Sequence, residues 1–248
     1  MSDHLAALLL SGAAGFPTAV GALAGVRVRS SLAHSITFGA AAGATLGAVA
    51  FDLLPRAARL TSLWLVAAAA AAGLAVVYGY DLVMHAGVTA GPKAEQRERA
   101  ETLHRRHGRG RGLAVLGGSL MVMRLAHGAV LGLAAGGTGV ALATAFGTSN
   151  LNDGFNLGQL GLADRRSGAA LGIWVSATII ALMGGAAASA WWLTGTAAWI
   201  RASVAAFGAG TLIYVSSAHL ISEAHAHEFA RSSTLALFGA FIAIFWLS

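Results

Sequence analysis

Long apolar stretches recur along almost the whole chain, and they constrain its fold more than any other feature. A helix needs about 20 apolar residues to cross the hydrocarbon core of a bilayer. Stretches of roughly this length lie at 4–25, 33–54, 61–85, 113–135, 138–161, 168–193, 200–222 and 233–248. The sequence therefore predicts an all-α integral membrane protein whose eight transmembrane helices form a single domain, 1–248.

The composition supports a membrane protein and excludes several other classes. Charged residues make up 10% of the chain, against about 25% in soluble domains. The absence of cysteine excludes disulfides, thiolate metal sites and a cysteine nucleophile. Lys and Arg lie almost entirely between the apolar stretches, where they set topology and contact anionic lipid. We therefore expect the lipid bilayer as a partner, and no nucleic acid.

The distribution of basic residues predicts the orientation. Twelve of the 16 Lys and Arg follow the first, third, fifth and seventh apolar stretches, and three follow the second, fourth and sixth. Because cytoplasmic loops carry the excess of Lys and Arg, we expect a multi-pass protein of the cell (inner) membrane with both termini outside. The longest connection, 86–112, is predicted to be a flexible basic cytoplasmic loop, in which His104 and His107 offer an alternative, a weak metal-sensing patch.

Two neighbouring apolar stretches carry polar residues at their centres. Arg124 is the one Lys or Arg placed inside a predicted helix, and a polar group in lipid is costly unless it faces a partner, water or a substrate. A short glycine-rich connection at 136–139 makes the two helices an antiparallel hairpin, so their centres meet. We predict a substrate site formed by Met123, Arg124, His127, Ser149, Asn150, Asp153 and Asn156. The alternative is a purely structural ion pair between Arg124 and Asp153.

A second candidate lies near the end of the seventh helix. His219 and Glu223 are four residues apart and therefore share a helix face, which predicts an exit site for the substrate. A hydrogen-bonded surface pair is the alternative. His34 and Asp52, near the two ends of the second helix, are expected at the membrane interface.

Several segments resemble one family of membrane proteins. The second helix ends in Phe51-Asp52-Leu53-Leu54-Pro55, the fourth contains Met123-Arg124-Leu125-Ala126-His127-Gly128, and the fifth contains Ser149-Asn150-Leu151-Asn152-Asp153-Gly154. In register, these segments are similar to motifs of the ZIP (Zrt/Irt-like) family of metal transporters. The resemblance implies a ZIP-like bundle in which helices 1, 4, 5 and 6 slide against helices 2, 3, 7 and 8 and expose a midplane site alternately. It also implies a transporter and not an enzyme.

The chain departs from the family pattern at the metal ligands. Where the family has His, Asn and Glu in helix 4, this chain has Met123, Arg124 and His127. Most of the bridging carboxylates are absent, which leaves His127 and Asp153 as the candidate metal ligands because zinc and iron accept imidazole and carboxylate. A guanidinium instead suits a carboxylate or phosphate on the substrate, which it holds through two parallel hydrogen bonds.

Three functions follow, in order of preference. The first is a ZIP-like carrier that moves a divalent metal such as zinc, iron or manganese by alternating access, with the metal as substrate and no other cofactor expected. The second is a carrier of an anionic small molecule or a metal-chelator complex that contacts Arg124. The third is a non-transporting pseudo-transporter. Under each of the three functions, a homodimer is one possible assembly of the chain.

Overall fold

The computed structural model describes residues 3–27, 30–84, 112–134, 139–163, 166–193, 195–225 and 229–248. Within these ranges the chain forms eight long helical segments and no strand, which confirms the all-α prediction. Most of the predicted cytoplasmic loop, residues 86–111 with His104 and His107, lies outside the described residues.

The helices follow one another with short connections wherever the connection is described. Their bounds are α1 Asp3–Arg27, α2 Ser31–Ala48, α3 Leu54–Leu60, α4 Leu63–Met84, α6 Gly112–Ala134, α7 Gly139–Ala163, α8 Gly168–Trp192, α9 Ala198–Tyr214, α10 Ser222–Ala224 and α11 Ala230–Leu247. Two π-helical segments, Val49–Leu53 and Val215–Ile221, join α2 to α3 and α9 to α10. Seven of the long segments are apolar enough to cross a membrane, and α7, which carries the polar residues, is the eighth.

The second helical segment is longer than predicted. It does not end at residue 54 but continues through the π-helical segment to Leu60, so Arg56 and Arg59 lie on a helix. Pro55, which has no backbone N–H to donate, lies in the first turn of α3, directly after the π-helical segment. Asp52, expected at the membrane interface, lies inside the π-helical segment with 4% of its surface exposed.

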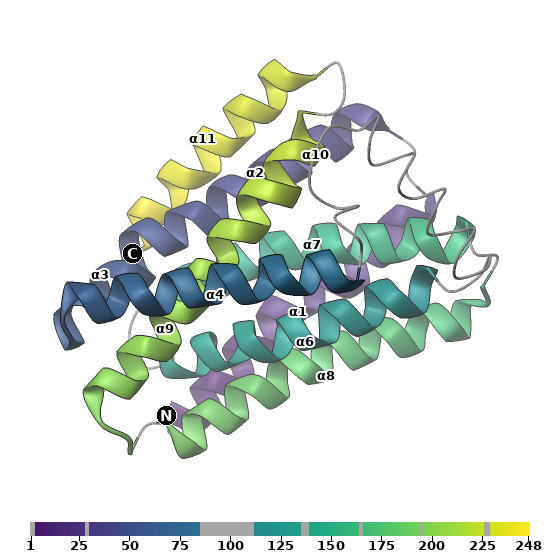
Figure 1. The fold of residues 1–248 in the computed structure, drawn as a ribbon. Helices are drawn as coiled ribbons and strands as arrows, with labels where there is room; N and C mark the ends of the chain where they lie inside the picture. Colours follow the sequence, from purple (N-terminus) through teal and green to yellow (C-terminus); the bar gives the residue numbers. More distant parts are fainter. Residues whose placement is uncertain are drawn as a thin grey trace.

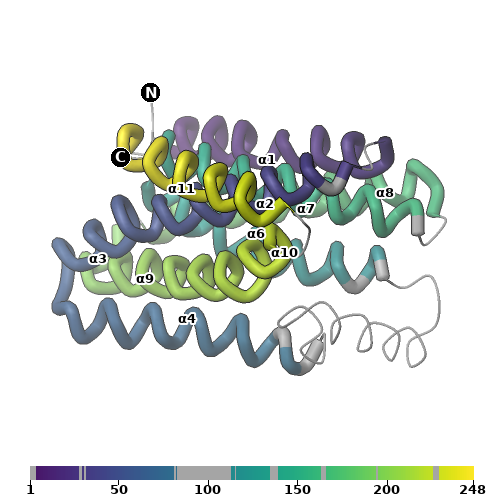
Figure 2. Tube along the Cα trace, turned by 90° about the horizontal axis from the view of Figure 1, so that it is seen from above, coloured from purple at the N-terminus to yellow at the C-terminus, as the bar shows by residue number. Residues whose placement is uncertain are grey.

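Four pairs of helices pack most extensively. α1 lies along α7, α6 along α8, α2 along α11, and α4 along α9, as Figures 1 and 2 show. Further contacts join α1 to α8 and α6 to α7, so α1, α6, α7 and α8 form one bundle, which we call the first bundle. α2, α4, α9 and α11 form the second bundle, in which α2 packs against the π-helical segment that follows α9.

Glycine allows the backbones of each pair to touch. A Cβ atom added at any of these glycines would overlap a backbone oxygen of the paired helix. These contacts are made against α7 by Gly21 and Gly25 of α1, against α1 by Gly154 and Gly158 of α7, against α8 by Gly128 and Gly132 of α6, and against α6 by Gly185 of α8. In the other two pairs, Gly39 and Gly43 of α2 contact α11, Gly73 of α4 contacts α9, and Gly210 of α9 contacts α4. Van der Waals contact between such small surfaces drives helix association in lipid, where the hydrophobic effect between helices is absent.

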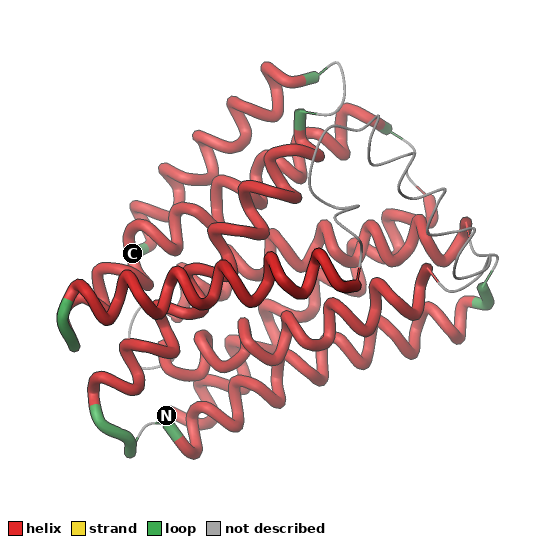
Figure 3. The backbone as a smooth tube through the Cα atoms, viewed as in Figure 1, coloured by secondary structure: helices red, strands yellow, loops and turns green. Residues whose placement is uncertain are grey.

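The ends of the chain are arranged as an even number of antiparallel segments requires. The beginning of α1 and the end of α11 lie at the same end of the molecule, and α4 ends and α6 begins at the opposite end (Figures 1 and 3). Large apolar side chains remain exposed on the outer surface, among them Trp64, Ile180, Trp191, Trp192 and Trp246, as expected of a protein that is solvated by lipid.

The glycine contacts make a prediction that two adjacent residues of α8 can test. Gly185→Ala places a Cβ against the backbone oxygen of Leu125 on α6, whereas nothing lies within 4 Å of a Cβ at Gly184. We expect Gly185→Ala to destabilise the protein by about 1–3 kcal/mol, the usual cost of overpacking. The matched control, Gly184→Ala, should leave stability unchanged or slightly raised. Thermal unfolding in detergent measures both, and equal effects would contradict this account of the packing.

Candidate functional site

The centres of α6 and α7 bring together five buried polar side chains. Arg124 and His127 on α6 are 1% and 0% exposed, and Ser149, Asn150 and Asn152 on α7 are at most 1% exposed. Their apolar neighbours Val122 and Leu125 are exposed, so α6 turns its polar residues inward. We call these five buried residues, together with Asp153, the polar centre.

An ion pair joins the two helices at the polar centre. Arg124 Nη2 donates a hydrogen bond to Asp153 Oδ2 over 2.6 Å, and the side chains are 1% and 13% exposed. The structural ion pair that the sequence offered as an alternative is therefore present. The Nε and Nη1 groups of Arg124 have no hydrogen-bond partner in the described part of the chain, so the guanidinium keeps unused donors in a dry environment.

His127 lies one helical turn from Arg124 and packs flat against a phenylalanine. Its ring stacks on Phe146 with centroids 4.8 Å apart and an interplanar angle of 6°. Both ring nitrogens are buried and have no hydrogen-bond partner among the described residues. The other predicted metal ligand, Asp153, has its carboxylate bonded to Arg124.

Two asparagines of α7 hold the helix in place. Asn150 Nδ2 donates to the backbone oxygen of Ala14 on α1 over 2.6 Å, within the first bundle. Asn152 Nδ2 donates to the backbone oxygen of Thr37 on α2 over 3.0 Å and so connects the two bundles. The amide nitrogen of Asn150, a predicted substrate contact, is thus used between helices. Asn152 was not among the predicted site residues, although its spacing of three from Ser149 and four from Asn156 placed it on the same helix face.

The remaining predicted residues of this site have different surroundings. Met123 is partly buried and packs against two apolar clusters, one containing Phe38 of α2 and the other Leu120 of α6. Ser149 is 1% exposed, and Asn156 is partly buried one turn beyond Asn152 on α7. Met123 therefore fills space between the bundles.

The residues of the predicted exit site contact other helical segments and an aromatic ring. Glu223 lies against the second helical segment, with His34 Nε2 3.1 Å from Glu223 Oε1. His34 stacks on Phe38 with ring centroids 4.3 Å apart, and His219 contacts the edge of the Tyr214 ring. His34 is 8% exposed, so this pair connects α2 to α10 inside the second bundle.

The donor set for a divalent metal is small. Across the ranges that the structure describes, no group of three or more His, Asp and Glu residues gathers as metal ligands would. A zinc site takes four ligands in a structural site and three protein ligands in a catalytic one. His127 and Asp153 thus would need ligands of other kinds, such as Ser149 or Met123, to hold a bare metal ion.

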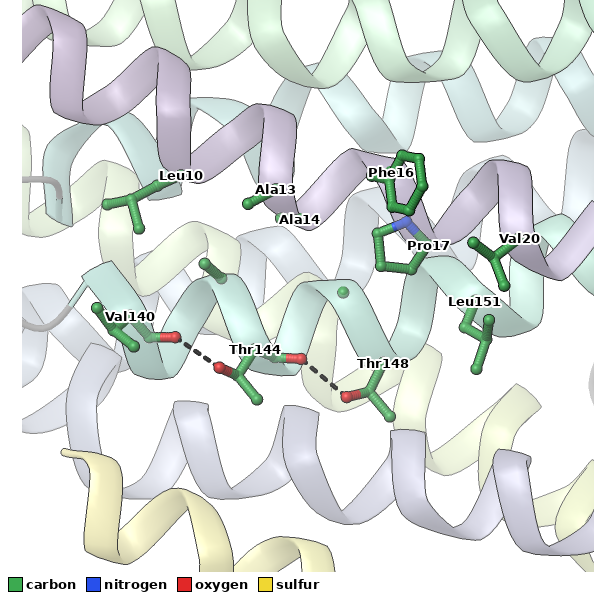
Figure 4. Close-up of a pocket in the computed structure, with 12 residues that line it drawn as sticks. Leu10, Ala13, Ala14, Phe16, Pro17, Val20, Val140, Thr144, Thr148 and Leu151 are labelled. Carbon is green, nitrogen blue, oxygen red and sulfur yellow. Dashed lines mark hydrogen bonds between the residues drawn. The ribbon is translucent and has the colours of Figure 1, made fainter.

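An apolar groove lies on the outer surface, apart from the polar centre. It runs between α1 and α7 and is lined by Leu10, Ala13, Ala14, Phe16, Pro17, Val20, Val140, Ala143, Thr144, Gly147, Thr148 and Leu151. Figure 4 shows that Thr144 and Thr148 bond to the backbone of their own helix. Phe16 and Val140 are 65% and 57% exposed. This groove faces the lipid side of the bundle and offers no charged group to a polar solute.

Comparison with known proteins found no matching family model and no matching curated protein. The description of the site therefore depends on its own residues and geometry.

Because of the ion pair, substitutions of Arg124 and Asp153 should have strongly non-additive effects on the free energy of unfolding. Asp153→Ala leaves the buried Arg124 charge without its partner, which should destabilise the protein by about 3–5 kcal/mol. Arg124→Met in the same chain removes that charge, so the double variant should be more stable than Asp153→Ala alone. Thermal unfolding of the wild type, both single variants and the double variant gives the coupling energy. Additive effects would show that the two side chains do not depend on each other.

Proposed function

We propose that this chain is a ZIP-like membrane carrier that moves a small solute past the polar centre by alternating access. The observation that carries the proposal is the buried Arg124–Asp153 pair, since ionisable residues inside a membrane span mark substrate pathways. It lies in the bundle of α1, α6, α7 and α8, beside the bundle of α2, α4, α9 and α11. This is the grouping of helices that the ZIP resemblance implies.

The pattern of helix pairs supports a carrier. The pairs repeat when helices are exchanged two by two: α1 with α8, α2 with α9, α4 with α11, and α6 with α7. This exchange converts the α1–α7 pair into the α8–α6 pair, and the α2–α11 pair into the α9–α4 pair. The two π-helical segments lie in the two segments that exchange, the second and the seventh. Many secondary transporters are built from inverted repeats with the substrate site where the repeats meet. α6 and α7, which carry the polar centre, are the two helices between the repeats.

The junction between the bundles is lighter than the packing within each of the four close helix pairs. It consists chiefly of α2 against α7 and of α6 against α9, and Asn152 contributes a single side-chain hydrogen bond there. Rigid pairs with a lighter junction favour motion of one bundle against the other, which is the rigid-body form of alternating access.

A divalent metal such as zinc, iron or manganese is the cargo that the ZIP resemblance implies. His127 favours it, because its imidazole is buried with both nitrogens unpartnered among the described residues. On this hypothesis His127→Ala and Asp153→Ala each abolish metal uptake. An anionic cargo is favoured instead by the unused donors of Arg124.

The motion can be tested by a disulfide across the junction, because the chain has no cysteine of its own. A Cβ at Gly208 on α9 would lie 3.6 Å from the Cβ of Val130 on α6, within the range of about 3.5–4.5 Å for disulfides. We expect Val130→Cys/Gly208→Cys, once oxidised, to stop uptake of Zn²⁺, Mn²⁺ or citrate into liposomes. A reducing agent should restore it.

A bridge inside one bundle is the matched control. The hydroxyl oxygens of Thr45 and Ser216 lie 2.7 Å apart, both in the second bundle. Oxidised Thr45→Cys/Ser216→Cys should therefore leave uptake intact. Uptake that persists through the oxidised α6–α9 bridge would refute motion between the bundles, and no uptake of any solute by the unmodified protein would point to a pseudo-transporter.

A further inference from the structure

We propose that the cargo presents a carboxylate to Arg124, and that Asp153 occupies the place of this carboxylate while the site is closed. The inference rests on the proposed carrier function and names the class of its substrate. Asp153 would then act as an internal counter-ion, which the substrate displaces and which returns when the substrate leaves.

The hydrogen bonds of Arg124 give the first argument. One donor of the guanidinium is used at 2.6 Å by Asp153, while Nε and Nη1 have no acceptor in the described part of the chain. A buried donor without an acceptor is costly, and Arg124 is 1% exposed. A carboxylate has two oxygens and can accept two parallel bonds from a guanidinium, so an incoming one would satisfy donors that Asp153 leaves unused.

Charge gives the second argument. The Arg124–Asp153 pair is neutral as a whole when both groups are ionised, which lowers the cost of keeping it inside a membrane. A dication on Asp153 would lie a few ångströms from the guanidinium, where like charges repel strongly in a dry interior. A carboxylate on Arg124 instead gives the guanidinium a counter-charge of the kind that Asp153 provides, and the displaced Asp153, the more exposed member of the pair, keeps its own negative charge.

Position gives the third argument. Asp153 is 13% exposed and Arg124 is 1% exposed, so Asp153 is the more accessible member of the pair. His127 follows Arg124 by three residues on α6, and residues at this spacing share a face. Its ring nitrogens have no partner within the described residues, so the face that carries Arg124 holds a second side chain with unused polar atoms.

The direction in which Asp153→Asn changes the affinity for a carboxylate separates this inference from its alternatives. Asp153→Asn keeps the shape of the side chain and removes the competing negative charge. If Asp153 occupies Arg124 about nine-tenths of the time, its removal should raise the apparent affinity for citrate about tenfold. A metal site predicts the opposite, since Asp153→Asn would remove a ligand of the metal. A static structural pair predicts no binding in either protein.

The experiment measures equilibrium binding and thermal stabilisation of the purified full chain in detergent. The probes are succinate, citrate, citrate with equimolar Zn²⁺, Zn²⁺ alone, Mn²⁺ alone and inorganic phosphate. We expect citrate or succinate to bind the wild type, to bind Asp153→Asn about tenfold more tightly, and to lose binding in Arg124→Gln. Citrate with and without Zn²⁺ separates a free carboxylate from a metal chelate. Asp52→Asn, a buried acid on another helix, is the matched control and should leave affinity unchanged.

Each other result decides the matter. Stabilisation by Zn²⁺ or Mn²⁺ alone, lost in Asp153→Asn, overturns the carboxylate and supports the metal; a preference for phosphate, or no probe bound by the wild type, also overturns it. If Asp153→Asn does not fold, Arg124→Lys serves as the test, because lysine keeps the positive charge but cannot donate two parallel hydrogen bonds. Weaker citrate binding by Arg124→Lys supports the inference, and unchanged binding refutes it.

Uptake into liposomes tests the carrier function separately. Citrate that binds to the protein but is not taken up contradicts the carrier function and leaves the carboxylate site standing.

Discussion

Contact between helix backbones at glycine is the interaction on which the rest of this structure depends. In lipid there is no hydrophobic drive to bring apolar helices together, so close van der Waals contact must do it. Each of the four helix pairs has at least one such contact: Gly21 with Leu151, Gly185 with Leu125, Gly43 with Leu237 and Gly210 with Ala70. Pairs held in this way have little freedom to slide internally, because any shift along the axis carries a neighbouring side chain onto a backbone oxygen.

Polar side chains have a complementary place in the architecture. Arg124 and Asp153 lie on α6 and α7, which belong to different close pairs, and so their bond joins the α6–α8 pair to the α1–α7 pair. Asn152 joins α7 to α2 in the other bundle. The backbone contacts thus build rigid pairs, whereas directional polar bonds connect one pair to another. Because a few hydrogen bonds can break and reform without unpacking a helix, the junctions are where a conformational change costs least.

The sequence was sufficient for features that depend on local pattern. Apolar length predicted eight helical segments, and the lone Arg124 on a hairpin with Asp153 predicted the ion pair as one of two alternatives. Features that depend on contacts between distant segments were not accessible. The contact of Glu223 with His34, 189 positions away, is one such feature. The burial of Asp52 inside a π-helical segment is another.

The sequence could not predict which residues of α6 point into the molecule, since successive side chains of a helix differ in direction by about 100°. The exposure of Val122 and Leu125, 60% and 49%, against 1% and 0% for Arg124 and His127, settles it. The guanidinium is therefore enclosed with one counter-charge in a medium where an unpaired charge is expensive. Any conformation that separates Arg124 from Asp153 must bring water or another negative group to the guanidinium. In the proposed carrier, that electrostatic requirement restricts the cargo more narrowly than the shape of the bundle does.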